Sequence, residues 1–160
     1  MSRLTLAKHD AEPEFTIVAS DLLGELRVRS DDLLTFPSGL LGFPECRRFA
    51  LLRAAHDGMF WLQSQDYSTL VFLLADPFRL VNDYSIEIGP SQIMEIGPHR
   101  PSDIAMLAIV TLPAATGEMA TANLQGPLAI NFATKMAKQI IVSETEFGVR
   151  WPIDLARVIT

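Results

Sequence analysis

Hydrophobic residues recur along the chain in short runs that are separated by glycine, proline, asparagine and aspartate. Runs of this length, apolar at alternate or at all positions, predict β-strands. The predicted strands cover residues 15–20, 24–29, 46–52, 59–63, 69–75, 104–112, 128–131 and 139–142. The first two form a hairpin, and 69–75 is so apolar that both of its faces are expected to be buried. Only residues 91–96 have the pattern of one or two helical turns, with Ser91 as the N-cap.

This recurrence of short strands predicts a mostly β fold: a small antiparallel β-barrel-like single domain with one or two short helical turns. A sheet of βαβ units is disfavoured because the chain has no long segments for crossover helices. We expect the domain to span residues 15–153, with a flexible N-terminal extension over 1–14 and a C-terminal tail over 154–160. A chain of 160 residues buries a sufficient core without a disulfide, and its one cysteine, Cys46, excludes an intrachain disulfide.

Charge is distributed unevenly along the chain, whose formal net charge is −6. Residues 54–134 contain eight aspartates and glutamates but only two arginines, so this segment accounts for the whole excess of negative charge. An acidic surface repels the phosphates of DNA and RNA, and we therefore expect no direct nucleic-acid binding. Such a surface favours a basic protein partner, chiefly by speeding the association.

Signatures of catalysis and of cofactor binding are missing from the sequence. The three histidines lie far apart without neighbours at metal-ligand spacing, and the chain has no phosphate-binding loop, dinucleotide fingerprint or nucleophile elbow. We expect a protein that is not an enzyme and that binds no cofactor and no metal. The N-terminus has no signal-peptide pattern, and no apolar run reaches the ~20 residues of a spanning helix. We therefore expect a soluble, cytoplasmic monomer that does not enter a membrane.

Residues 35–43, with the sequence TFPSGLLGF, predict a tight turn because they contain a proline and two glycines. In one interpretation the turn caps the barrel: Phe36 and Phe43 plug its end, and Gly39 and Gly42 supply positive φ angles or close approach. In the other interpretation this loop contacts a partner, and the residues concerned are Phe36, Pro37, Gly42 and Phe43.

Five further positions are candidate partner contacts. Asp76 and Pro77 predict a strand-terminating turn in which Asp76 bonds local backbone N–H groups, or alternatively a contact with a partner. Asn123 lies among apolar residues, so its amide is expected to bond the backbone of an adjacent loop or that of a partner. Glu87 and Glu95 belong to a solvated face, or to the part of that face that meets a basic partner.

Four segments, in order, resemble the flagellar assembly factor FliW family. They are residues 35–43 (TFPSGLLGF), 60–64 (FWLQS) with the strand and Asp-Pro-Phe turn that follow, 107–113 (LAIVTLP), and 121–124 (TANL) with Pro127, Ile130-Asn131 and 138–141 (KQII). The resemblance covers roughly residues 15–153. Leu41 stands where proline is common in the family, and Phe147 where tyrosine is common.

The resemblance implies a cytoplasmic partner of the flagellin monomer that, in many bacteria, antagonises the RNA-binding translational repressor CsrA. After flagellin is exported, the freed factor is expected to bind the CsrA-type repressor and relieve its block on flagellin synthesis. An apolar groove beside the barrel would suit the helical, amphipathic ends of flagellin. Three alternatives stay open: a small-molecule-binding barrel with a cavity lined by Phe, Met and Leu, an OB-like nucleic-acid binder, and an enzyme of unknown type.

Overall fold

The computed structural model describes residues 14–142 and 145–156. The predicted N-terminal extension, apart from Glu14, and residues 157–160 of the predicted tail lie outside the described residues. The strands are β1 (Phe15–Ser20), β2 (Gly24–Arg29), β3 (Leu33–Thr35), β4 (Arg48–Arg53), β5 (Met59–Ser64), β6 (Val71–Ala75), β7 (Ile104–Thr111), β8 (Ala120–Ala122), β9 (Leu128–Asn131), β10 (Met136–Gln139) and β11 (Trp151–Ile153). The described residues also contain a short helix, α2 (Pro77–Leu80), and the 3-10 turns η1 (Ser30–Asp32), η2 (Pro90–Gln92), η3 (Met94–Ile96) and η4 (Pro101–Asp103).

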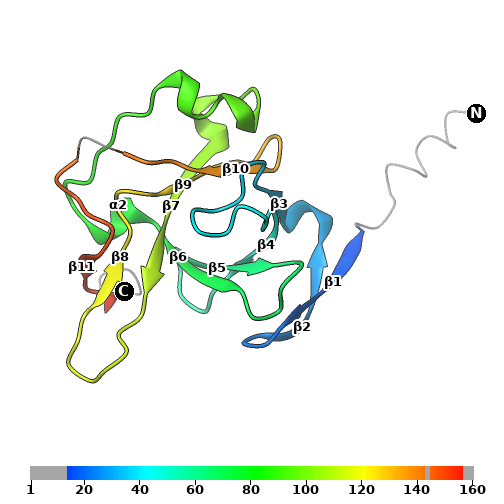
Figure 1. Ribbon diagram of the computed structural model, residues 1–160, viewed down its shortest axis with the longest axis horizontal. Coiled ribbons are helices and arrows are strands. Elements are labelled where there is room, and N and C mark those ends of the chain that lie inside the picture. The colour runs from blue at the N-terminus through cyan, green and yellow to red at the C-terminus, as the bar shows by residue number, and fades with distance from the viewer. Residues whose placement is uncertain (1–13, 143–144, 157–160) are drawn as a thin grey trace, which may run out of the picture.

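Seven of these strands form a closed barrel, shown in Figure 1. Their order is β7-β6-β5-β4-β3-β10-β9, and β9 pairs with β7 to complete the ring. Neighbouring barrel strands are antiparallel except β10 and β3, which are parallel at their one paired position. Closure leaves few unpaired strand edges. The predicted mostly β, barrel-like fold with short helical turns is confirmed.

Large apolar side chains fill the inside of the barrel. Every one of its strands contributes to this cluster, through Leu34, Phe49, Leu62, Leu74, Leu107, Leu128, Ile130 and Ala137. Phe36, Leu40 and Cys46, from the loop between β3 and β4, complete the cluster. A small-molecule barrel needs an open cavity where these side chains pack. The packed interior therefore lends no support to that alternative.

Strands β6 and β7 form a wall between the barrel interior and a second apolar cluster outside it. Leu74 and Leu107 belong to the interior, whereas Leu73, Ala75 and Ala108 pack outside with residues of α2, β8 and β11. This division follows from the strand period, because successive side chains point to opposite faces. Leu73, Leu74 and Ala75 are all buried. The prediction that 69–75 is covered on both faces is therefore confirmed for this part of the run.

A row of aromatic rings packs along the outer cluster. Tyr84 lies between Phe78 and Phe147, at centroid distances of 5.4 and 5.1 Å, and Phe147 meets Trp151 edge-on at 4.9 Å. The buried Tyr84 hydroxyl donates to the Leu124 carbonyl at 2.9 Å. Burial also raises the pKa of Tyr84 to about 12. We call residues 81–103, between α2 and β7, the long loop. The hydrogen bond holds this loop against the segment that follows β8.

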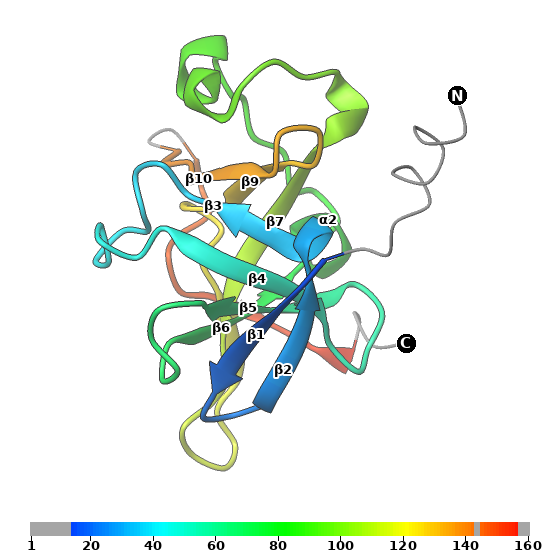
Figure 2. The same cartoon turned by 90° about the vertical axis from the view of Figure 1, so that its right-hand side faces the viewer.

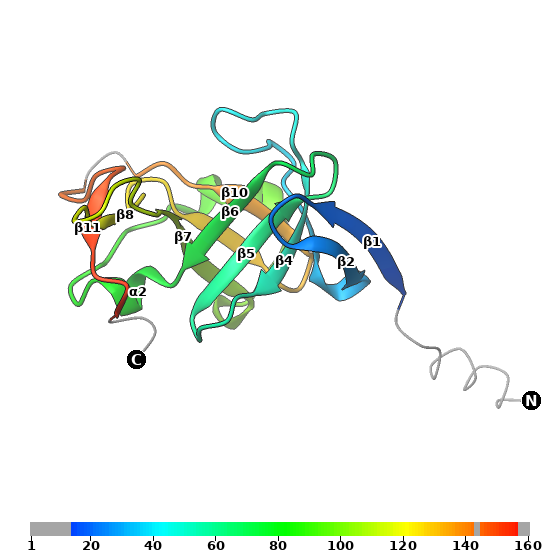
Figure 3. The same cartoon turned by 90° about the horizontal axis from the view of Figure 1, so that it is seen from below.

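The β1–β2 hairpin lies outside the barrel, next to β4 (Figures 2 and 3). Phe15 pairs with Arg29 and Ser20 with Gly24, so the predicted hairpin is confirmed. Val18 and Val28 are buried on one face of the hairpin and belong to the same cluster as Ala50 of β4. The hairpin is thus attached to the barrel by packing of its apolar face.

Two predicted elements differ from the structure. The strand predicted at 139–142 is wrong, because β10 ends at Gln139 and the next N–H groups leave the ladder: Ile140 donates to the Pro127 carbonyl, and Val142 to that of Gln125. The predicted N-cap at Ser91 is also wrong, because the first turn, η2, begins at Pro90 and Gly89 is its N-cap. The Gly89 N–H donates to the Gln92 side chain at 2.7 Å.

The sequence pattern also misses three short strands and misplaces the start of another. β3, β8 and β11 have three residues each, which is too short for a period of two to be recognised. The strand predicted at 46–52 begins at Arg48, because Cys46 still belongs to the preceding loop, where its N–H donates to the Phe43 carbonyl at 3.1 Å.

Replacing Tyr84 with phenylalanine removes the hydroxyl and keeps the ring. We expect Tyr84→Phe to lower the free energy of unfolding at pH 7 by about 1–2 kcal/mol, because the Leu124 carbonyl loses its donor. Tyr67→Phe, at the other, exposed tyrosine, is the matched control and should change it by less than about 0.5 kcal/mol. Urea unfolding of the three proteins measures both effects.

The raised pKa of Tyr84 also predicts a pH dependence. The unfolded chain releases the phenolic proton near pH 10.0, whereas the folded protein keeps it to about pH 12. This contribution to stability is therefore complete below pH 10 and is lost as the pH rises toward 12, by about 3 kcal/mol in all. The difference in unfolding free energy between the wild type and Tyr84→Phe should fall over that range. A difference that stays constant from pH 9 to 12 contradicts the raised pKa of Tyr84 in the folded protein.

Candidate functional site

The loop between β3 and β4 enters the end of the barrel. Phe36 is fully buried, and its ring packs edge-on against Phe49 at 5.2 Å. The chain then turns sharply: the Gly39 N–H donates to the Phe36 carbonyl at 2.9 Å, and Leu40 and Phe43 exchange backbone hydrogen bonds at 3.2 and 2.7 Å. We call residues 36–44 the plug. Its placement supports the capping interpretation for Phe36.

Two side chains from other parts of the fold anchor the plug. The Ser38 hydroxyl lies 2.9 and 3.0 Å from the two carboxylate oxygens of Glu95, in η3. Glu95 also forms an ion pair with Lys138 of β10, at 3.5 Å. On the same strand, the Gln139 side-chain oxygen accepts from the Leu41 N–H at 2.9 Å. The plug is therefore fixed to both the long loop and β10.

Gln139 links the plug to Asn123 through a chain of hydrogen bonds. The Gln139 amide nitrogen donates to the Gly126 carbonyl at 3.0 Å, and the Gly126 N–H donates to the Asn123 side-chain oxygen at 2.8 Å. A Cβ at Gly126 would lie 2.9 Å from the Asn123 amide nitrogen, so the turn is closely packed. Asn123 thus bonds the backbone of an adjacent loop, which is one of its two predicted roles.

The plug still presents surface to a partner. Leu41 is 69% exposed and Phe43 37% exposed, and the Phe43 ring packs edge-on against Phe72 at 5.9 Å. Gly42 is exposed between them, whereas Pro37 is half-buried. A cleft of about 220 Å³ lies beside the plug, lined by Ser38, Gly39, Leu40, Leu41, Gly42, Pro44, Lys138 and Gln139. Of the predicted contacts in the plug, Gly42 and Phe43 are exposed, and Gly42 also lines this cleft.

A larger apolar groove lies where β6 turns into α2. It measures about 370 Å³ and is lined by Gly58, Phe60, Asp76, Phe78, residues 104–107 and Phe132. Asp76 caps α2, since its carboxylate accepts from the Phe78 N–H at 2.9 Å, and Pro77 is buried. The predicted turn at Asp76 is confirmed. Asp76 borders the groove, whereas Pro77 does not line it.

Glu87 and Glu95 have different surroundings. Glu87 is exposed and has no ion-pair partner within the described part of the chain. Glu95 is half-buried and bonded to Ser38 and Lys138. Among the other carboxylates, Asp66 pairs with Arg48, whose guanidinium lowers the pKa of Asp66 by hydrogen bonding. The free acidic surface is accordingly smaller than the residue count predicts.

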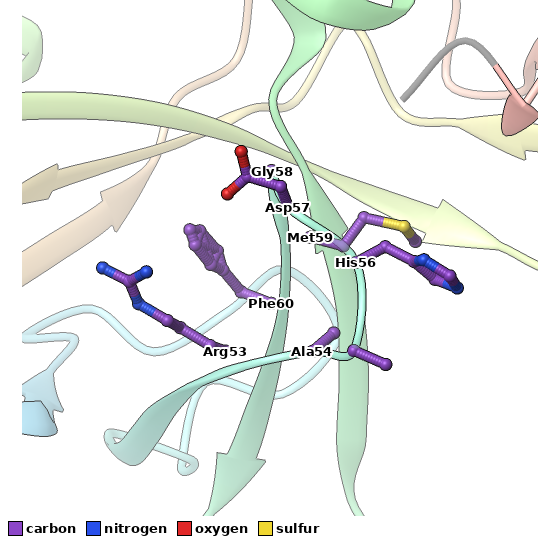
Figure 4. A pocket seen from close by; sticks show the side chains of 8 residues that line it. Arg53, Ala54, His56, Asp57, Gly58, Met59 and Phe60 are labelled. Carbon is purple, nitrogen blue, oxygen red and sulfur yellow. The ribbon is translucent and has the colours of Figure 1, made fainter. Parts of the chain in front are cut away.

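A polar hollow of about 280 Å³ follows the β4–β5 turn and is drawn in Figure 4. Arg53 and Phe60 point to one side of this hairpin, and His56 and Met59 to the other. Asp57 forms an ion pair with Arg79 at 3.8 Å. Among the described residues, no three side chains of His, Cys, Asp or Glu are grouped to hold a metal ion.

Comparison with known proteins places this geometry in a family. The family model described as FliW protein matches residues 17–153. The chain belongs to the FliW family. The flagellar assembly factor FliW of Natranaerobius thermophilus is 34% identical over 137 residues, which are 85% of this chain and 91% of that protein. Its counterpart in Treponema denticola is 32% identical over 136 residues, covering 85% and 92%.

A crystal structure of the flagellar assembly factor FliW has the same fold. It matches with a TM-score of 0.77 and 27% sequence identity, over 86% of this chain and 96% of that one. Of the FliW segments recognised in the sequence, 35–43 contains most of the plug, and 121–124 and 138–141 contain Asn123 and Gln139, which support it. No helix in the described part of the chain has the length and apolar character needed to cross a membrane.

Sequence reasoning missed most of the residues that line the apolar groove of this FliW chain. Phe60 and Met106 lie on strands whose pattern gives no sign that one face meets a groove, and Phe132 follows β9 in a turn. Ser38 and Gln139 lie within quoted motif segments, but their mutual anchoring depends on contacts between distant parts of the chain. The general expectation of an apolar groove beside the barrel was the one signal available.

Gly39 is the plug residue for which a larger side chain has least room. Its φ is +68°, and a Cβ there would lie 2.5 Å from the Pro44 carbonyl oxygen. Gly42 has a similar φ of +86°, but a Cβ there meets nothing within 4 Å. We expect Gly42→Ala to cost about 1 kcal/mol of stability from φ strain alone, and Gly39→Ala about 2 kcal/mol more. Equal losses in urea unfolding contradict the close approach.

Proposed function

We propose that this FliW-family chain is a non-enzymatic assembly factor that binds the flagellin monomer in the cytoplasm. By partner switching it also antagonises a CsrA-type translational repressor, so that free flagellin controls its own synthesis. Family membership supports the flagellar role, and the apolar groove is the observation that carries the flagellin part. No covalent chemistry is required, because each step is a binding equilibrium.

The groove has the properties of a peptide-binding surface. Phe78 is 53% exposed and Phe132 41% exposed, and the half-buried Phe60 lies between the groove and the polar hollow. Aromatic side chains that project from a rigid framework are frequent energetic centres of protein interfaces. Gly58 of the β4–β5 turn and Asp76 before α2 also line the groove. A segment of flagellin with apolar side chains would bury these rings on binding.

The acidic part of the long loop supports the second part of the proposal, the binding of a CsrA-type repressor. Asp83 and Glu87 are exposed, and neither has an ion-pair partner among the described residues. A repressor that binds RNA must present basic surface, to which these carboxylates are complementary. Such long-range attraction acts mainly on the association rate. Glu95 is a poor member of this face because Lys138 already neutralises it.

The proposed binding of flagellin is tested by a substitution in the apolar groove. Phe132 packs near Lys135, with the ammonium 5.5 Å from the ring centre, and does not belong to the interior cluster. We expect Phe132→Ser to weaken binding of soluble flagellin about tenfold or more, because a ring that is buried in the complex is lost. Leu22→Ser, at an exposed leucine in the hairpin turn, is the matched control and should leave affinity unchanged.

Calorimetry at several temperatures measures these affinities and the heat-capacity change, which should be negative for apolar burial. The assembled filament should not bind if the recognised segment is buried there. Failure of wild-type protein to bind soluble flagellin, both in calorimetry and in co-elution, contradicts the flagellin part of the proposal.

The proposed binding of a CsrA-type repressor predicts an effect on the association rate. We expect Asp83→Lys with Glu87→Lys to slow association with a CsrA-type repressor and leave dissociation nearly unchanged, because steering acts before contact. The control is Glu25→Lys with Asp32→Lys, which makes the same change of net charge on and beside the hairpin. Stopped-flow rates over a salt series measure the effect, which screening should abolish as the Debye length falls from ~10 Å at 0.1 M to ~3 Å at 1 M. Association that is independent of salt and of the first pair removes the acidic loop from the mechanism.

A further inference from the structure

Strand β7 extends beyond the strand that pairs with one of its edges. β6 pairs with β7 at three positions, the last of which is Ala75 opposite Ala108. Continuing this register by two residues places Pro77 opposite Met106. Proline has no N–H to donate, and at Pro77 the chain already turns into α2. The first residues of β7 therefore have no strand beside them on the β6 side.

The direction of the backbone groups on β7 follows from its other neighbours. The Ile109 carbonyl accepts from the Asn123 N–H at 2.9 Å, and the Asp103 carbonyl accepts from the Phe132 N–H at 2.9 Å, both on the side of β8 and β9. Because these groups alternate along a strand, odd-numbered residues point to that side and even-numbered residues to β6. Met106 thus directs its N–H and carbonyl to the open edge.

One neighbouring group on this edge is already occupied. The Ile104 N–H donates to the Pro101 carbonyl within η4, which leaves the Ile104 carbonyl directed along the open edge. No strand described in the structure pairs with Ile104 or Met106 on this side. The edge consequently offers one donor and two acceptors in the spacing of a β-ladder.

These groups lie in the apolar groove. Residues 104–107 form part of its lining, and the side chains of Phe60, Phe78 and Phe132 line it as well. An apolar groove can take up a peptide as a helix or as an added strand. A helix makes its own backbone hydrogen bonds, so it would cover the N–H and carbonyl of Met106 without pairing them. An extended segment would pair both groups directly. The open backbone groups therefore favour the strand.

We propose that the open edge of β7 at Ile104–Met106 binds an extended segment of the flagellin monomer, with apolar side chains at alternate positions, as an added β-strand. One residue of the segment exchanges two backbone hydrogen bonds with Met106. In an antiparallel arrangement, the residue two positions further along donates to the Ile104 carbonyl. The alternate apolar side chains pack on the phenylalanine rings. This inference rests on the proposed function, because flagellin is taken as the source of the segment.

Amide hydrogen exchange of the labelled protein, read by NMR, tests the proposal at a single atom. In the free protein, the Met106 amide should exchange at least tenfold faster than those of Ala105 and Leu107, which face β9. Saturating soluble flagellin should slow the Met106 amide at least tenfold, while the amides of the exposed β7–β8 loop stay fast. A slow Met106 amide in the free protein overturns the premise of an open edge.

The outcomes with flagellin separate this inference from the proposed function. If flagellin binds and the Met106 amide remains fast, the added strand is contradicted and the proposed function stands. If flagellin does not bind, the proposed function fails and this inference fails with it.

A backbone variant gives an independent reading. Met106→Pro removes the N–H that faces the groove and no ladder bond to β9, so we expect a folded protein with at least tenfold weaker flagellin binding. Met106→Leu keeps the N–H with a side chain of similar size and should bind as the wild type does. Equal affinity of a folded Met106→Pro and the wild type overturns the proposal. Should Met106→Pro fail to fold, the exchange measurement decides.

Discussion

The antiparallel ladder between β7 and β9 closes the barrel, and the remaining structure is arranged around it. β7 uses one edge for β6 and divides the other between β9, along its first half, and β8, near its end. One strand therefore supports both the ring and the outer layer. Because its side chains alternate, the same strand also buries Leu107 inside the barrel and Ala108 outside it. Loss of this ladder would open both apolar clusters to water.

Closing a small barrel also leaves an end to be covered. The plug covers it with Phe36 and Leu40 and is held from outside by Glu95 and Gln139. These anchors come from the long loop and from β10, so the plug, the loop and the Asn123 turn form one connected polar network. The motifs that identify the family are thus structural to a large extent. Contacts with partners are left to the surfaces that this framework displays.

The sequence predicts the elements whose signal is local. The hairpin, the run 69–75 and the strand 128–131 follow from alternation or continuous apolarity, and the turn at Asp76 follows from Asp-Pro chemistry. β8 and β11 are too short to show a period. Residues 140–142 look like a strand because they are apolar, although Ile140 and Val142 are buried outside a ladder and Ile141 is exposed.

Prediction of the site is limited by contacts between distant residues. Glu95 looks like a member of the acidic face until Lys138 and Ser38 are seen beside it. Asn123 and Phe36 are chosen for their chemical type, but their partners within the fold account for them. The open edge at Met106 depends on where β6 stops relative to β7, which is a property of register and carries no sequence pattern of its own.

We propose that the barrel leaves a short edge of β7 unpaired inside an apolar groove, and that flagellin binds at this edge. The decisive measurement is a crystal structure of the chain bound to the soluble flagellin monomer. We expect an extended flagellin segment beside β7, with backbone N–H and carbonyl groups at about 2.9 Å from those of Met106. Flagellin seated elsewhere, or lying as a helix across the groove with the Met106 groups unpaired, would contradict it.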